Sequence, residues 1–171
     1  MPDLWDDIAG GAAEESSLWA DCLTAEPDRT AVFSPLAGPE HALGLETIYE
    51  GYLVHYGRSR LFAPPDDDTA LLLGDYLYAH GLVRIAHDVD AVADLSELIS
   101  LSSQLRAEER DGDGSLWAAT ASLLGRRALD EPFAALRLHA DPAPLDAAGR
   151  AAAGEEAVDA ALAAHAERRV R

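Results

Sequence analysis

The sequence predicts an all-α, single-domain helical bundle. Apolar residues recur at spacings of three and four along most of the 171-residue chain, which is the period of a helix. No stretch shows the alternation of apolar and polar residues that is typical of a strand. Hydrophobic residues make up 49% of the chain, so it can bury a sizeable core. We therefore expect about six to eight helices.

The first two predicted helices cover residues 14–23 and 42–62. Trp19 anchors the short helix, and Pro39 after Gly38 suits the start of the long one. The loop "APPDDD" ends the long helix, because two prolines cannot continue it. The predicted apolar face of this helix consists of Leu45, Ile48, Tyr49, Tyr52, Leu53, Tyr56 and Leu61.

Each of the next two predicted helices has an aspartate as its N-cap. Asp67 or Asp68 caps a helix over 69–87, and Asp88 or Asp90 opens the helix "AVADLSELISLSSQLRAEER". The apolar face expected for the first is Leu72, Leu73, Tyr76, Leu77, Ala79, Leu82, Val83 and Ile85. The one expected for the second is Val92, Leu95, Leu98, Ile99, Leu101 and Leu105.

Shorter helices are predicted further on. "DGDGS" is a turn that offers an N-cap to the helix "LWAATASLLGRRAL", and Asp130 or Glu131 starts a helix in "PFAALRL".

The C-terminal part is alanine-rich, and we expect Gly149 and Gly154 to interrupt it. The predicted organisation is a helical domain over 1–142 and a helical tail over 143–171.

The net charge of −18, with a pI near 4.4, argues against nucleic acid or an anionic membrane surface as a partner, because both would repel the chain. The charge is consistent with an acidic binding face or with a general compositional habit of the source proteome. Cys22 is the only cysteine, which excludes an internal disulfide and a cysteine-based zinc site. The acidic N-terminus does not look like a signal peptide, and "TALLLG" is far shorter than the roughly 20 residues of a spanning helix. We expect a soluble, cytoplasmic protein without a transmembrane segment.

Two acidic clusters resemble cation sites but have simpler interpretations. The run 66–68 could hold Mg²⁺, yet acids at a helix start are favoured by the macrodipole, and we favour capping. Asp111 and Asp113 resemble the opening of a calcium loop, but the later acidic ligands are missing. We interpret this segment as a turn.

The histidines offer a third possible metal site. His55, His80 and His87 with Asp88 could be assembled into a histidine–aspartate hydrolase site, but their spacing does not favour it. No serine lies in a nucleophile-elbow context, and no glycine-rich phosphate loop is present. Composition and spacing alone therefore name no reaction.

Gly74 and Asp75 stand out within an otherwise apolar helical run. Glycine costs roughly 1 kcal/mol against alanine inside a helix, and an aspartate in an apolar face needs a partner. The pair indicates either close helix packing with a locally paired carboxylate, or a carboxylate that faces an interior cavity.

The stretch "LLLGDYLYAHGLVRIA" resembles the "GDYL" helix of the trans-polyprenyl diphosphate synthases, which are all-α class I isoprenoid synthases. The preceding stretch, "LETIYEGYLVHYGRSRLF", is similar to the family's helix that carries the first Asp-rich motif. In the family that motif holds Mg²⁺ on the allylic diphosphate. Its aspartates fall here on Tyr56, Gly57 and Arg60, so all are lost. The resemblance covers about residues 40–127, and the second Asp-rich motif has no counterpart.

The resemblance implies a truncated isoprenoid-synthase fold without catalytic residues, metal or cofactor. It is closest in pattern to the non-catalytic small subunit of two-component heptaprenyl or hexaprenyl diphosphate synthases. The implied role is that of an accessory or regulatory subunit in isoprenoid biosynthesis, for quinone side chains or carotenoids. The implied partner is a catalytic prenyl diphosphate synthase, and a homodimer is the other expectation.

Two alternatives stay open. The chain could be a stand-alone helical protein that binds an apolar or prenyl ligand in a reduced cavity. It could also be a metal-dependent enzyme that uses the unusual ligands Glu46, Glu50, His55, Asp75 and His80. Glu46 and Glu50 are four residues apart and share a face, but an ordinary solvated stripe has the same spacing, and we favour that interpretation. The residues expected to line a cavity or ligand site are Glu46, Tyr49, Tyr52, His55, Asp75, Tyr76 and His80.

Overall fold

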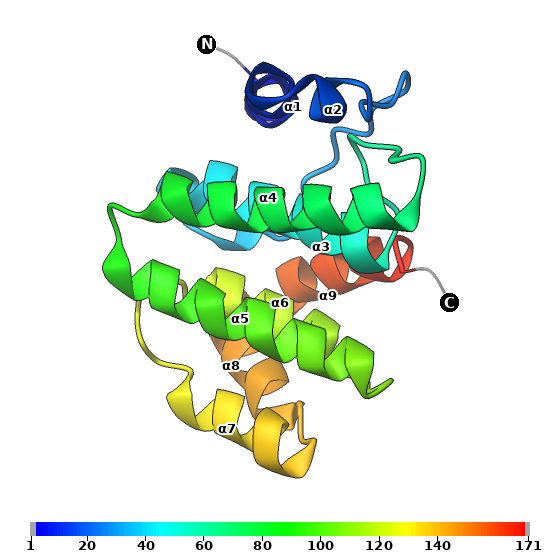
Figure 1. Ribbon diagram of the computed structural model, residues 1–171. Helices are drawn as coiled ribbons and strands as arrows, with labels where there is room; N and C mark the ends of the chain where they lie inside the picture. The colour runs from blue at the N-terminus through cyan, green and yellow to red at the C-terminus, as the bar shows by residue number, and fades with distance from the viewer. Residues whose placement is uncertain (1–2, 170–171) are drawn as a thin grey trace. The chain divides into compact units, whose positions relative to one another are not determined.

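A computed structural model describes residues 3–169, and within this range the chain is an all-α bundle with no β-strand (Figure 1). The predicted fold class is confirmed. The α-helices are α1 (Leu4–Glu15), α2 (Ser17–Ala20), α3 (Ala42–Tyr56), α4 (Asp67–Ile85), α5 (Val89–Ala107), α6 (Asp113–Ser122), α7 (Asp130–His139), α8 (Ala143–Ala153) and α9 (Glu155–Ala166). The short 3₁₀ helices η1 (Ser34–Leu36) and η2 (Pro39–His41) precede α3.

Contacts within the bundle divide it into two compact units. The first consists of the chain up to Ala31, Leu43–Arg84 and the residues from Arg168 on, and it contains α1, α2 and nearly all of α3 and α4. The second consists of Val32–Ala42 and Ile85–Glu167, and it contains η1, η2 and α5 to α9. The domain boundary predicted after residue 142 is not tested by this division.

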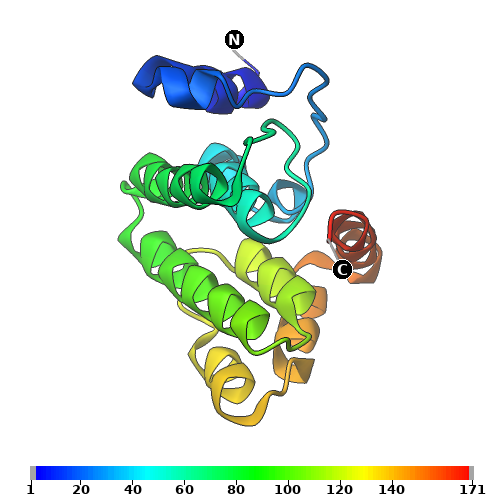
Figure 2. The ribbon, with the colours of Figure 1, turned by 45° about the vertical axis from the view of Figure 1, so that its right-hand side comes forward.

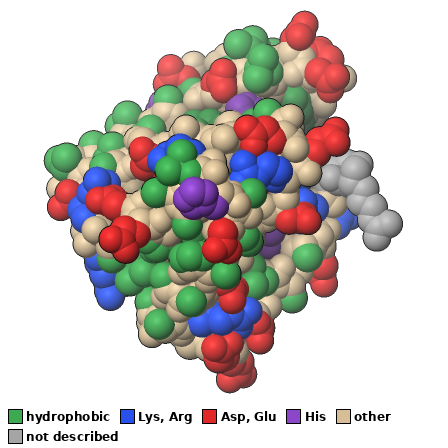
Figure 3. Space-filling view, turned by 90° about the horizontal axis from the view of Figure 1, so that it is seen from below, with side chains coloured by type: hydrophobic (Ala, Val, Ile, Leu, Met, Phe, Trp, Pro, Cys, Tyr) green, Lys and Arg blue, Asp and Glu red, His purple; other side chains and the backbone are tan. Residues whose placement is uncertain are grey.

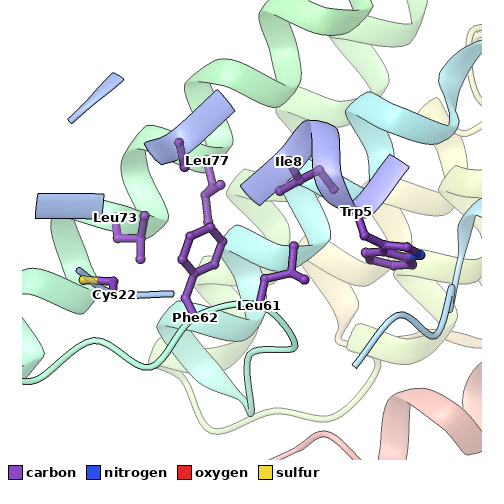
Figure 4. Close-up of a cluster of buried hydrophobic side chains, with 8 residues drawn as sticks. Trp5, Ile8, Cys22, Leu61, Phe62, Leu73 and Leu77 are labelled. Atoms are coloured by element: carbon purple, nitrogen blue, oxygen red, sulfur yellow. The ribbon is translucent and has the colours of Figure 1, made fainter. Parts of the chain in front are cut away.

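In the first unit, α1 and α2 lie across the α3–α4 pair (Figures 1 and 2). Their contact is an apolar cluster, shown in Figure 4, in which side chains of α1 meet those of α4 and of the segment that follows α3. The buried members of this cluster are Trp5, Ile8, Ala12, Cys22, Leu61, Phe62, Leu73 and Leu77. Burial of this apolar surface is the main term that holds α1 and α2 on the unit.

Glycines set the distance between α3 and α4. A Cβ added at Gly81 would lie 2.9 Å from the Gly44 carbonyl oxygen, and one added at Gly51 would lie 3.0 Å from the Gly74 carbonyl oxygen. Each helix thus carries two glycines seven residues apart, and they meet in antiparallel order. Close packing, which was one of the two interpretations of Gly74, accounts for the helix-interior glycines.

The second unit is built around α6, of which every residue from Leu116 to Ser122 is buried. Helices α5, α8 and α9 and the turn η1 all contact it. Phe33 stacks on Trp117 with ring centroids 5.6 Å apart. A Cβ at Gly149 would lie 3.3 Å from the Ala119 backbone, so α8 packs closely on α6.

Several predicted boundaries are wrong. The helix predicted over 14–23 corresponds to the shorter α2 (Ser17–Ala20), which contains Trp19, and α1, which begins at Leu4, was not predicted. The helix predicted over 42–62 ends at Tyr56, and the following segment turns back over it. Gly149 does not interrupt α8, because it lies within that helix and lets it pack closely on α6, whereas Gly154 does separate α8 from α9.

The predicted apolar face of α4 is only partly correct. Leu73, Leu77 and Ile85 are buried, but Leu72 is 55% exposed and Val83 is 70% exposed. The helix is apolar over most of its circumference, so the period alone could not tell which side faces the core.

Aspartates cap α4 and α5, as the sequence predicts in kind. The backbone N–H of Thr69 donates to Asp66 Oδ1 at 2.7 Å, so the cap of α4 is Asp66 rather than Asp67 or Asp68. The N-cap of α5 is Asp88, which accepts from the Ala91 N–H at 3.0 Å. Capping therefore explains part of the acidic run 66–68.

None of the helices within residues 3–169 combines the length and the apolar character that crossing a membrane would require.

The C-terminal stretch is tied to the first unit through Asp28. Arg168 Nη2 donates to Asp28 Oδ2 at 2.6 Å, and the Thr30 N–H donates to Asp28 Oδ1 at 2.9 Å. Burial acts to raise the pKa of the Asp28 carboxyl, but the hydrogen bonds from Thr30 and Arg168 outweigh it and lower this pKa to about 2.

We predict that Asp28 contributes to acid sensitivity. Its pKa is lower in the folded than in the unfolded chain, so its contribution to stability is present above about pH 4 and is lost as the pH falls through about 2. Because the side chain is half exposed, the contribution is expected to be about 1 kcal/mol. In urea unfolding across this range, Asp28→Asn should flatten the loss of stability, whereas Asp21→Asn, at another exposed carboxylate, should leave it unchanged. If the free energy of unfolding fell equally with pH below about 4 in the wild type and in Asp28→Asn, the prediction would be contradicted.

We also predict that Gly81→Ala destabilises the protein. The new Cβ would lie 2.3 Å from Ile48 Cγ1 as well as close to the backbone of α3, so the helices would have to separate. The expected loss in free energy of unfolding is about 1–3 kcal/mol, measured by urea denaturation. The matched control is Gly10→Ala in α1, where no atom lies within 4 Å of the added Cβ. It should gain about 0.5–1 kcal/mol, and an equal gain for both variants would rule out the close approach.

Candidate functional site

The strongest concentration of charge inside the protein lies on α3. Glu46 and Glu50 share one face of this helix, and both are fully buried. Arg60, from the segment after α3, reaches both: Nη1 lies 2.7 Å from Glu46 Oε2, and Nε lies 2.9 Å from Glu50 Oε2. The solvated stripe that we favoured for the two glutamates is therefore wrong. We call Glu46, Glu50 and Arg60 the buried ion triad.

Other donors and acceptors of the triad also form hydrogen bonds and ring contacts. Arg60 Nη1 donates to the Thr30 carbonyl at 2.9 Å. The guanidinium carbon lies 4.6 Å from the Trp5 ring centroid and 5.0 Å from that of Tyr49, within the range of cation–π contacts. Glu50 Oε1 accepts the backbone N–H groups of Arg60 at 2.8 Å and of Leu61 at 2.9 Å, and also the Ser59 hydroxyl. The triad thus fixes the segment after α3 onto that helix.

The two glutamates stabilise the charged form of Arg60. Burial acts to lower the pKa of the Arg60 guanidinium, but the two glutamates more than offset this and raise it. Burial raises the pKa of the Tyr49 phenol beside it. The guanidinium stays charged at any ordinary pH, so the carboxylates stay engaged and are not free to bind another cation.

The three positions where the resemblance places the lost aspartates have different surroundings in the structure. Tyr56 is the last residue of α3. Gly57 forms an isolated bridge with Arg169, and the Arg58 N–H donates to the Arg168 carbonyl at 2.9 Å, so the C-terminal stretch lies along this segment. Arg60 enters the core. The structure does not bring these positions together as an open ligand site.

His55 fills the gap that Gly74 leaves on α4. A Cβ at Gly74 would lie 2.0 Å from His55 Nε2. This nitrogen lies 3.0 Å from the Leu71 carbonyl oxygen, which can only accept, so Nε2 carries the proton. Asp75 Oδ1 is 3.6 Å away, but its side chain is 65% exposed. The interpretation of Asp75 as a carboxylate facing an interior cavity is therefore wrong, and its side chain lies at the surface beside His55.

The other expected lining residues lie in packed surroundings. Tyr49 and Tyr52 are buried and stack with ring centroids 6.0 Å apart. The Tyr76 hydroxyl donates to the Gly11 carbonyl at 3.3 Å, and the Tyr76 ring packs on His80 with centroids 4.3 Å apart. Among residues 3–169, no three histidine, cysteine, aspartate or glutamate side chains form a group that could hold a metal ion.

Two histidine–aspartate pairs in the second unit, one buried and one partly buried, were not anticipated. His41 Nε2 lies 3.0 Å from Asp88 Oδ2, and His165 Nε2 lies 3.1 Å from Asp113 Oδ2. The hydrogen bond from the Ala91 N–H lowers the pKa of the Asp88 carboxyl, and His41 lowers it further. Asp88 also caps α5, and Asp113 is buried at the start of α6, so both pairs are explained by the packing of the second unit. Their sequence separations of 47 and 52 residues left no local signal.

An open depression of about 430 Å³ in the second unit contains two arginines, Arg127 and Arg137. Each is paired with acids: Arg127 lies 3.3 Å from Asp94 Oδ1 and 3.4 Å from Asp130 Oδ1, while Arg137 pairs with Glu97. Burial raises the pKa of the Asp94 carboxyl. Because both arginines are already paired with carboxylates, the depression is a poor candidate for binding an anion.

Acidic side chains do not form one continuous patch on the face seen in Figure 3. Basic side chains lie among them, and apolar areas separate the groups. On this face the excess of acid is therefore dispersed.

Comparison of the chain with protein-family models, with curated proteins and with solved structures found no match.

We predict that Arg60→Met strongly destabilises the protein, because it leaves two buried carboxylates without their cation. The expected loss in free energy of unfolding is about 3–5 kcal/mol, measured by urea denaturation. Because this variant could fail to fold, the triple variant Glu46→Gln/Glu50→Gln/Arg60→Met provides a second measurement. It should recover part of the loss, since it buries no unpaired charge.

The matched control is Arg29→Met. Arg29 also pairs with two carboxylates, Asp3 and Asp6, each at 2.7 Å, but it is exposed. This variant should leave the urea midpoint almost unchanged. A loss at Arg60 no larger than that at Arg29 would show that the triad contributes no more than surface ion pairs.

Proposed function

We propose that this protein is a catalytically inactive, polyprenyl-synthase-like accessory subunit of a prenyl diphosphate synthase, in the biosynthesis of quinone side chains or carotenoids. The observation that carries the proposal is the buried ion triad. The resemblance places an aspartate of the metal-binding motif at Arg60, and here a guanidinium at that position pairs with both Glu46 and Glu50 inside the core.

The chemistry of the family explains why this supports an inactive role. Ionising an allylic diphosphate needs Mg²⁺ held by several carboxylate oxygens that are free to bind it. The glutamates of α3 are already paired with a cation that belongs to the chain itself, the guanidinium of Arg60. The phenol of Tyr56 and the backbone of Gly57 offer no replacement for carboxylates. A chain of this kind would contribute by binding a catalytic subunit rather than by transferring prenyl groups.

Co-purification from the native host tests the proposal. Tagged protein, isolated at about 50 mM and about 150 mM salt, is expected to bring down a synthase that carries both Asp-rich motifs. Because the chain carries a net charge of −18, the control is an unrelated protein with the same tag and a similar negative charge. Recovery of no prenyl synthase at either salt concentration would overturn the accessory role.

Activity measurements give the second half of the prediction. With an allylic diphosphate, isopentenyl diphosphate and Mg²⁺, the chain alone should form no detectable product. Added to the recovered synthase, it should change the length or the yield of the product. Product formation by the chain alone, scaling with its concentration, would show that it is an enzyme.

A further inference from the structure

The outward side of α4 carries apolar side chains that its own unit does not cover. Leu72 is 55% exposed, Val83 is 70% exposed, and Ala79 between them is also exposed. The half-buried Tyr76 lies at the edge of this line. We call Leu72, Tyr76, Ala79 and Val83 the α4 seam.

The exposed members of the seam, Leu72, Ala79 and Val83, are separate from the sides of α4 that hold the unit together, whereas Tyr76 also packs against the apolar cluster. Leu73 and Leu77 enter the apolar cluster with α1, and Gly74 and Gly81 face α3. The Tyr76 ring packs 5.8 Å from that of Trp19, so it borders the seam without covering Leu72 or Val83. Replacing Leu72 and Val83 alone would therefore leave the internal packing of α4 intact.

The spacing of the seam suits another helix. Its positions follow intervals of four, three and four residues, which is the pattern of the contact line between two packed helices. The line from Leu72 to Val83 spans about 16 Å of helix axis, which corresponds to three turns. A single helix of a partner is thus the occupant whose shape fits.

The charges beside the seam indicate the sign of that partner. Asp68 and Asp75 flank Leu72, and both are exposed. Arg84, next to Val83, is directed to α1, where its Nη2 donates to the Asp7 carbonyl at 3.0 Å, and it forms no ion pair with Asp68 or Asp75. A second copy of this chain, with a net charge of −18, would set acid against acid.

We propose that the α4 seam docks an amphipathic helix of the partner protein, in which Lys and Arg flank the apolar residues. The proposal rests on the proposed function only in taking the partner to be another protein. The seam would bury its apolar side chains, while Asp68 and Asp75 would select for basic flanks and accelerate association.

Synthetic helical peptides test this surface on the full chain. The probe is a labelled peptide of about three heptads with leucines at the seam positions and lysines and arginines beside them. Fluorescence anisotropy should show saturable binding. A scrambled peptide of the same composition, which lacks an apolar face, should bind at least about 10-fold more weakly. Equal binding of both peptides, or binding of neither, would overturn the proposal.

Variants locate the binding. Leu72→Gln/Val83→Gln should weaken binding at least about 10-fold, because it removes the apolar contact without changing the charge. Leu138→Gln is the matched control, since Leu138 is 70% exposed on α7. It should change binding less than about 2-fold. Asp68→Asn/Asp75→Asn should weaken binding about 3-fold and reduce its salt dependence. Binding that is unaffected by the seam variant would place the peptide elsewhere and overturn the proposal.

Two further outcomes are decisive. If sedimentation shows a dimer of the wild type that Leu72→Gln/Val83→Gln converts to monomers, the occupant is a second copy and the proposal is wrong. If a synthase co-purifies equally well with the seam variant, the accessory role stands and the surface is wrong. If no synthase co-purifies but the peptide binds through the seam, the accessory role fails and the surface stands.

Discussion

The first unit depends on how one arginine satisfies two buried carboxylates. Helix α3 is buried at every residue from Gly44 to Leu53, so its glutamates have no access to water. An unpaired charge in that position would cost several kcal/mol, and a single monodentate partner could not serve two carboxylates. The fork of Arg60 reaches both through different nitrogens, and its remaining donor capacity reaches Thr30. The sharp turn after Tyr56 follows from this requirement, because an extended helix would carry Arg60 away from Glu46 and Glu50.

On another side of α3, glycines of α3 and α4 make its complete burial possible. A helix that is buried all round needs neighbours that come close, and Gly44, Gly51, Gly74 and Gly81 let two backbones approach. His55 then occupies the space that a side chain at Gly74 would fill. The polar triad and the glycine contacts leave little freedom in α3. Its residues are therefore fixed as a core element, whereas α4 presents one side to the core and another to the outside.

The sequence predicted the elements that local signals define and missed those that depend on distant pairing. The all-α class, α5 with its Asp88 cap and α7 starting at Asp130 follow from period and capping. The triad could not be predicted, because two glutamates four residues apart look the same on a solvated stripe and in a core. Its partner is 10 and 14 residues away, beyond a turn that the sequence placed too late. On α4 the period identified apolar positions, but a helix that is apolar on most sides does not reveal which side the core will cover. For this reason Leu72 and Val83 were predicted to face the core but are exposed.

The triad also bears on what such a chain can do. A magnesium site neutralises carboxylates with a cation that can enter, bind a diphosphate and leave, whereas a guanidinium in the core is a cation that cannot exchange. Replacing buried ion pairs by apolar groups is often neutral or favourable, so stability alone does not explain why two glutamates and an arginine are used here. What the structure shows is that Arg60 and the two glutamates hold the segment after α3 on that helix. On the surface of the same unit, α4 combines the exposed apolar side chains of Leu72 and Val83 with the exposed carboxylates of Asp68 and Asp75, which is where a partner could be recognised without disturbing this core.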